Sequence, residues 1–194
     1  MERNAHIERK TNETDINLKL LLDSINPSSI NTGIGFFNHM LLLMVTHGKM
    51  FLELNVKGDL EIDGHHTVED VGICFGKAFN KALGDKKGIM RFGQATVPMD
   101  EACSSVIIDI SGRGYFLYKG DALSGLIQSY SEELTVEFFR SFAHNAQITI
   151  HIHQLYGQNR HHIHESIFKA AGLALYRAYS VGYDNTIPST KGIL

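Results

Sequence analysis

The stretch that decides the fold is His65–Leu83, HHTVEDVGICFGKAFNKAL, because its pattern recurs 96 residues later, at residues 161–179, as HHIHESIFKAAGLALYRAY. Both stretches begin with a histidine pair and place a glutamate four residues after the first histidine. The shift also aligns Gly76 with Gly172. The apolar spacing that follows is typical of a helix. We therefore predict an internal duplication in which each half contributes one such helix.

The rest of the chain predicts two similar α+β halves. Alternating or β-branched apolar residues predict strands, namely Ile16–Leu22, Met50–Val56, Leu60–Ile62, Val106–Ile110, Tyr115–Tyr118 and Gln147–Leu155. Helical spacing predicts helices at Phe36–Thr46, Thr67–Leu83, Glu132–Ala143 and Ile163–Tyr179. In each half, a pair of helices covers one face of an antiparallel or mixed sheet. The halves span residues 1–93 and 94–194, within one compact domain.

The composition excludes several classes of protein. The 194 residues are 43% hydrophobic, and the net charge of −3 shows no basic stripe, so we expect no nucleic-acid partner. The longest apolar run, Met40–Val45, is too short to span a membrane. No apolar stretch follows Met1, which predicts no secretory signal. Cys74 and Cys103 cannot build a disulfide framework or a thiolate zinc site, which predicts a protein of the reducing cytoplasm.

The 11 histidines indicate a metal site, because they cluster in the two duplicated motifs. Residues i and i+4 of a helix share a face, whereas i and i+1 diverge by about 100°. One metal can therefore take His65, Glu69 and His162, and a second can take His161, Glu165 and His66. This swapped assignment is a geometric hypothesis. Imidazole and carboxylate ligands suit Mn²⁺, Fe²⁺ or Zn²⁺.

Other polar residues have two possible interpretations. His39 lies inside an apolar run, where it is either a core histidine or a further ligand. Glycines flank Arg91 and Arg113, and glycine lets the backbone approach a bound anion. The tail residues 188–192, PSTKG, are either a disordered terminus or a phosphate-binding segment, which we call the phosphate clamp.

Taken together, these residues resemble the imidazoleglycerol-phosphate dehydratase family of histidine biosynthesis. The matching segments run nearly from end to end: residues 9–14 (RKTNET), 33–41 (GIGFFNHML), 58–70 (GDLEIDGHHTVED), 98–101 (PMDE), 109–113 (DISGR), 161–165 (HHIHE), 168–170 (FKA) and 188–192 (PSTKG). The resemblance implies an enzyme, a hydro-lyase that converts D-erythro-imidazole glycerol phosphate to imidazole acetol phosphate and water. It also implies two Mn²⁺ ions per active site and a duplicated fold like ribosomal protein S5 domain 2. Its members assemble from trimers into a 24-chain homo-oligomer with active sites between subunits.

The resemblance also assigns roles to individual residues. The implied metal ligands are His39, His65, His66, Glu69, Glu137, His161, His162 and Glu165. The implied substrate contacts are Glu13, His47, Arg91, Arg113, Lys169, Ser189, Thr190 and Lys191. Glu13, His39 and Glu165 are the expected catalytic residues. We expect His144, His151, His153 and His164 not to be ligands.

The chain departs from the family pattern at four positions. Glu137 stands where the family often has a histidine ligand, and a carboxylate can also bind Mn²⁺. Gly64 and Asn38 replace aspartates that precede histidines, and Gly114 replaces a proline. Loss of the aspartates is expected to weaken the orientation of the neighbouring imidazoles.

The implied reaction makes chemical sense. Metals at both ring nitrogens would favour the imidazolate, whose electrons can expel the C3 hydroxyl. Glu13 is the candidate proton shuttle, and the phosphate clamp orients the substrate through a remote group.

Two other functions fit parts of the pattern. A dinuclear metallohydrolase could use the same ligands on a phosphoester, although such enzymes usually draw ligands from aspartate-rich strand ends. A metal-binding or shell-forming protein without catalysis would leave Arg91 and Lys191 without a task.

Overall fold

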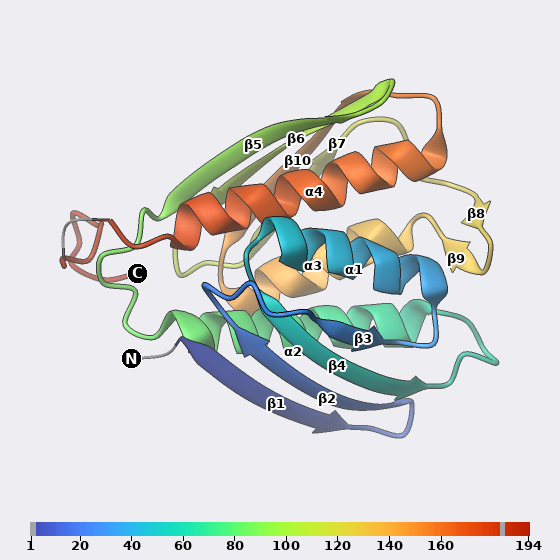
Figure 1. The fold of residues 1–194 in the computed structure, drawn as a ribbon, viewed down its shortest axis with the longest axis horizontal. Helices are drawn as coiled ribbons and strands as arrows, with labels where there is room; N and C mark the ends of the chain where they lie inside the picture. The colour runs from blue at the N-terminus through green and yellow to red at the C-terminus, as the bar shows by residue number, and fades with distance from the viewer. Residues whose placement is uncertain (1–2, 183–184) are drawn as a thin grey trace.

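Two four-stranded sheets enclose the four helices of the computed structural model, which describes residues 3–182 and 185–194 (Figure 1). The first sheet has the order β1-β2-β4-β3, with β1 at Asn4–Lys10, β2 at Thr14–Leu21, β3 at Ser29–Asn31 and β4 at Phe51–Gly58. The second has the order β5-β6-β10-β7, with β5 at Phe92–Met99, β6 at Ala102–Asp109, β7 at Tyr115–Lys119 and β10 at Thr149–Tyr156. The helices are α1 (Gly35–His47), α2 (His65–Leu83), α3 (Leu134–Ala146) and α4 (Arg160–Tyr179).

The predicted duplication is confirmed by the topology. In each sheet two antiparallel pairings are followed by one parallel pairing, β4 with β3 and β10 with β7. Each sheet is therefore mixed, as expected. The four predicted helices are present, with boundaries that differ from the prediction by a few residues.

One predicted strand is wrong. Leu60–Ile62 forms a turn, in which the Ile62 N–H donates to the Asp59 carbonyl at 2.9 Å. Its three residues are bounded by Gly58 and Gly64, so they are too short to pair. The sequence analysis also missed β1, β3, β5 and the short hairpin of β8 (Leu126–Ile127) and β9 (Tyr130–Ser131).

The core lies between the sheets and is continuous across both halves. In β2 every second residue is buried, and Leu18 and Leu20 are fully buried against the helices. The opposite face of β2 is polar, as alternation in a half-buried strand requires. The expected division at residues 93 and 94 falls inside β5.

The helices pack in pairs that cross the two halves. Helix α1 lies on α4, and α2 lies on α3. Gly172 of α4 faces the Met44 carbonyl of α1, and Gly76 of α2 faces the Phe142 carbonyl of α3. A side chain at either glycine would meet backbone, so both contacts need the missing Cβ. No helix of the described residues is long and apolar enough to cross a bilayer.

The close α1–α4 contact predicts an effect on stability. Replacing Gly172 with Ala forces a Cβ against the Met44 carbonyl, and overpacking of this kind costs about 1–3 kcal/mol. Gly35→Ala is the matched control, because its Cβ meets nothing within 4 Å. Denaturant unfolding of the metal-free protein should show a lower free energy of unfolding for Gly172→Ala only. Equal values for the two variants would contradict the close-packing explanation.

Candidate functional site

Three predicted ligands meet where α1 crosses the start of α4. One oxygen of Glu165, Oε1, lies 2.9 Å from His39 Nε2 and 3.0 Å from His161 Nε2. Ligand atoms of all three residues lie within 4.8 Å of one another. His161 and Glu165 are four residues apart on α4, so they share a face as the spacing predicted. His39 is therefore part of this cluster and not an isolated core histidine.

Glu165 is ionised although its side chain is only 10% exposed. Burial raises its pKa, but hydrogen bonds from Lys169, His39 and His161 outweigh burial and hold the pKa at about 2. Lys169 Nζ binds the second carboxylate oxygen at 2.6 Å. His47, at the end of α1, has its pKa lowered by burial and by the charge of Lys169. The cluster thus combines a carboxylate anion with two imidazoles, a donor set that suits Mn²⁺, Fe²⁺ or Zn²⁺.

The second histidine of each pair binds a carboxylate through Nδ1. Asp59 Oδ2 lies 2.9 Å from His66 Nδ1, and Glu101 Oε2 lies 2.7 Å from His162 Nδ1. These hydrogen bonds raise the pKa of both histidines. The hydrogen bond from His162 lowers the pKa of Glu101 to about 2. The Nε2 atom of each histidine is left for another partner.

A further carboxylate stands near each of those Nε2 atoms. Glu13 Oε1 is 3.8 Å from His66 Nε2, and Asp100 Oδ2 is 3.8 Å from His162 Nε2. Both side chains are more than half exposed, and each lies in a turn between two antiparallel strands. Glu13 therefore lies beside a predicted ligand, as the proton-shuttle hypothesis requires.

Side-chain caps fix where the two histidine motifs begin. Asp63 Oδ1 accepts from the His65 N–H at 2.7 Å, and Asn159 Oδ1 accepts from the N–H groups of His161 and His162. Such caps satisfy amides that lack partners inside the helix. Both motifs therefore lie in the first turn of a helix.

Helix packing identifies Glu137 as the structural counterpart of His39. Gly172 lies against Met44, and its duplicate Gly76 lies against Phe142. Counting back five residues from Met44 gives His39, and the same count from Phe142 gives Glu137. Glu137 thus stands on α3 where His39 stands on α1. Its carboxylate is paired with Arg140.

Within one chain, the residues of the two ligand sets that the sequence suggested do not come together. Among the residues that the structure describes, His39, His161 and Glu165 form the one group of three potential ligands. His66 is not in that group, and His65, Glu69 and His162 form no group of their own there. The rings of His65 and His66 are perpendicular, with an interplanar angle of 90°.

The predicted phosphate-binding residues lie near the carboxyl end of α4, whereas the histidine motif lies at its start. Arg91 donates through Nε to Asp109 at 2.8 Å and through Nη1 to the Pro188 carbonyl at 2.9 Å. Gly112, next to Arg113, lies against Leu194. The tail that contains Ser189, Thr190 and Lys191 therefore packs beside both arginine segments, and the side chains of Arg113 and Lys191 are exposed.

His164, which we expected not to be a metal ligand, is a buried histidine. Its side chain is fully buried, and Nδ1 lies 2.9 Å from Thr135 Oγ1. Burial lowers its pKa to about 4. His144, His151 and His153 lie in no ligand group of the described residues.

The residues that contact the predicted site residues were not predicted from the sequence. These are Asp59, Asp63, Asp100, Glu101, Asp109 and Asn159. Asp100 and Glu101 belong to the PMDE segment, which signalled the family but was given no role. The role of Asn159 could have been predicted, because asparagine just before a helix favours N-capping.

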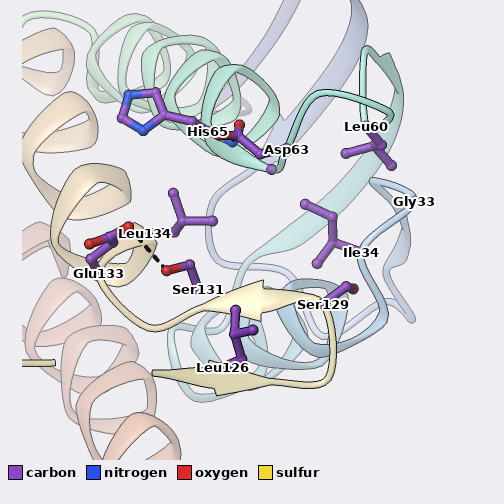
Figure 2. Close-up of a pocket in the computed structure, with 11 residues that line it drawn as sticks. Gly33, Ile34, Leu60, Asp63, His65, Leu126, Ser129, Ser131, Glu133 and Leu134 are labelled. Atoms are coloured by element: carbon purple, nitrogen blue, oxygen red, sulfur yellow. Dashed lines mark hydrogen bonds between the residues drawn. The ribbon is translucent and has the colours of Figure 1, made fainter. Parts of the chain in front are cut away.

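A cavity of about 200 Å³ lies beside the histidine motif of α2 (Figure 2). Gly33, Ile34 and Leu60 line one side, and Leu126 and Leu134 line another. The ring of His65 points away from the space between these apolar side chains (Figure 2). The cavity therefore borders the motif without containing the three-ligand cluster.

Comparisons with known proteins agree on one family. The family model described as imidazoleglycerol-phosphate dehydratase matches residues 32–175. A protein of that name from Oceanobacillus iheyensis is 51% identical, covering 99% of this chain and 100% of the relative. Another, from Gluconacetobacter diazotrophicus, is 52% identical and covers 99% of this chain and 98% of the relative.

Solved structures of the same name share the fold. The enzyme from Staphylococcus aureus has a TM-score of 0.83 and 37% identity, covering 92% of this chain and 99% of that one. The enzyme from Pyrococcus furiosus, solved in complex with (S)-C348, has a TM-score of 0.82 and 33% identity, covering 97% of this chain and 100% of that one.

Proposed function

The chain belongs to the imidazoleglycerol-phosphate dehydratase family, and we propose that it performs the reaction for which the family is named. It converts D-erythro-imidazole glycerol phosphate to imidazole acetol phosphate and water in histidine biosynthesis. The observation that best supports this is the His39–His161–Glu165 cluster together with its duplicated histidine motif. Imidazole and carboxylate ligands without thiolate suit a metal that must also bind the imidazole ring of a substrate.

Two Mn²⁺ ions are the proposed cofactors. His39, His161 and Glu165 would hold one, because their donor atoms already lie within 4.8 Å of one another. His65 and Glu69, with Glu137 as counterpart of His39, would contribute to the other, and His66 and His162 each offer Nε2. Bound metal would supply Lewis acidity, which lowers the pKa of the substrate's ring N–H and so favours the anionic ring, a better electron donor than neutral imidazole.

The chain's own side chains would bind the substrate and move its protons. Glu13 Oε1 holds the proton removed from the carbon next to the ring, and its exposed position beside His66 supports that role. Arg113, Ser189, Thr190 and Lys191 bind the phosphate. Arg91, the other implied substrate contact in this region, donates to the Pro188 carbonyl and so holds the tail in place.

We further propose that each active site is shared between subunits of a homo-oligomer, built from trimers into 24 chains. The Arg91 N–H donates to the Ala178 carbonyl at the end of α4, whereas His161 lies at its start. A helix rises about 1.5 Å per residue, so these points are about 25 Å apart. A small phosphorylated imidazole cannot span that distance, so one chain's phosphate clamp must serve another chain's metal ligands.

Metal reconstitution tests the activity. Metal-stripped protein should dehydrate imidazole glycerol phosphate only after Mn²⁺ is added, with the product followed as its enolisable ketone. A simple aryl phosphate should release no inorganic phosphate under the same conditions. Phosphate release without dehydration would favour the metallohydrolase, and Mn²⁺ binding with neither activity would favour a metal-binding or shell-forming protein.

Replacing Glu13 with Gln tests the proton shuttle. The amide keeps the size of the side chain but cannot accept the proton, so kcat should fall about 100-fold or more while KM changes little. Steady-state kinetics with saturating Mn²⁺ would measure both. Unchanged kcat would remove Glu13 from this role.

Co-expression of two defective variants tests the shared site. Glu165→Gln damages the metal cluster and Lys191→Ala damages the phosphate clamp, so each alone should lose most activity. Hybrid assemblies should regain activity, because some sites then combine an intact cluster with an intact clamp. A matched control pairs Lys191→Ala with Ser189→Ala, which leaves every clamp damaged. Sites built within one chain would show no recovery in either mixture, and native mass spectrometry would give the assembly size.

A further inference from the structure

Glu101 uses both oxygens of its carboxylate to accept hydrogen bonds. Oε2 lies 2.7 Å from His162 Nδ1. Oε1 accepts from the N–H groups of Asn159, at 2.6 Å, and Gln158, at 3.3 Å. Asn159 in turn caps α4 by accepting from the His161 and His162 amides. One carboxylate thus holds both the imidazole of His162 and the loop that sets where its helix begins.

Asp59 holds His66 in the first half, but from a different place and with one oxygen. Its Oδ2 lies 2.9 Å from His66 Nδ1, whereas Oδ1 is buried and has no hydrogen-bond partner among the described residues. Asp59 follows β4, while Glu101 lies in the turn between β5 and β6. The two carboxylates are therefore not related by the sequence duplication, although they contact equivalent histidines.

A carboxylate at Nδ1 determines which nitrogen of a neutral imidazole is free. An ionised carboxylate only accepts hydrogen bonds, so the ring must have its proton on Nδ1 and its lone pair on Nε2. Histidine ligands of metals are commonly oriented by such a partner. We propose that Glu101 is a positioning residue that fixes the ring and tautomer of His162, so that Nε2 is the atom presented to a divalent cation, and that Asp59 does the same for His66.

The inference rests on the metal-binding part of the proposed function. It predicts that replacing the carboxylate by an amide has different effects at Glu101 and at Asp59. An amide has one accepting oxygen and one donating NH₂ group. At position 59 an asparagine can place its oxygen on His66 and its NH₂ where Oδ1 has no partner. At position 101 a glutamine cannot satisfy His162 and the loop amides together. Once its oxygen binds the loop, its NH₂ faces His162 and favours the opposite tautomer.

Two variants and two measurements test this difference. Metal-free protein with ¹⁵N-labelled histidine rings is studied by solid-state NMR at alkaline pH, where the rings are neutral. Glu101→Gln should move the His162 proton to Nε2, whereas Asp59→Asn should leave the His66 proton on Nδ1. Equilibrium dialysis should then show Mn²⁺ affinity about 10–100-fold weaker for Glu101→Gln. Glu8→Gln is the control, because Glu8 is an exposed carboxylate 3.7 Å from His6 Nε2 on the outer face of the first sheet.

The result that overturns the proposal is Glu101→Gln with the proton still on Nδ1 of His162 and Mn²⁺ affinity unchanged. Should that variant fail to fold, Glu101→Asp keeps the carboxylate and should keep the Nδ1 proton. A proton on Nε2 in Glu101→Asp would equally contradict the proposal. Neither measurement involves dehydration, so a protein that passes both but lacks the activity refutes the proposed reaction alone.

Discussion

The close contact of α1 with α4 is the constraint on which the rest of the site depends. Gly172 lets the Met44 turn of α1 approach α4 at backbone distance. That approach brings His39 beside His161 and Glu165, which belong to the other half of the chain. The same contact recurs at Gly76 between α2 and α3. Because α1 and α4 belong to different halves, neither half could form the His39–His161–Glu165 cluster alone.

The sequence predicted the main helices because their apolar spacing is regular and long. It also predicted that His161 and Glu165 share a face, which follows from helix geometry alone. Residue spacing alone left His39 as either a core histidine or a further ligand, and only the family resemblance made it a ligand, because its place in the cluster depends on how α1 crosses α4. The strands β1 and β5 were missed because β1 has only one large apolar residue, Ile7, and β5 contains Gly93 and Pro98, which are unusual inside strands. Leu60–Ile62 alternates like a strand, but its flanking glycines place it in a turn.

Two of the four departures from the family pattern have local explanations in the structure. Asn38 accepts hydrogen bonds from the N–H and the hydroxyl of Thr32, so its side chain fixes the start of α1 and does not orient an imidazole. A side chain at position 64 would meet Ile34 and Leu134 at 3.1 and 3.2 Å. Apolar side chains would therefore have to shift slightly to make room for an aspartate there. The carboxylates of Asp59 and Asp63 bind the neighbouring histidines instead, through a ring nitrogen and a backbone amide.

The position of the ligands on the helices explains why so many charged side chains surround them. The amino end of a helix has a partial positive charge, which disfavours a divalent cation, and the carboxyl end disfavours a phosphate. The proposed metal ligands lie at the amino ends of α2 and α4, and the proposed phosphate clamp lies at the carboxyl end of α4. Side chains must therefore overcome the helix dipole at both places. Glu165 does so within the first turns of α4 and remains ionised despite its burial. The exposed side chains of Arg113 and Lys191 supply the opposite charge at the far end, where Arg91 is ion-paired with Asp109 and holds the tail. Charged side chains of opposite sign thus oppose the helix dipole at the two ends of α4.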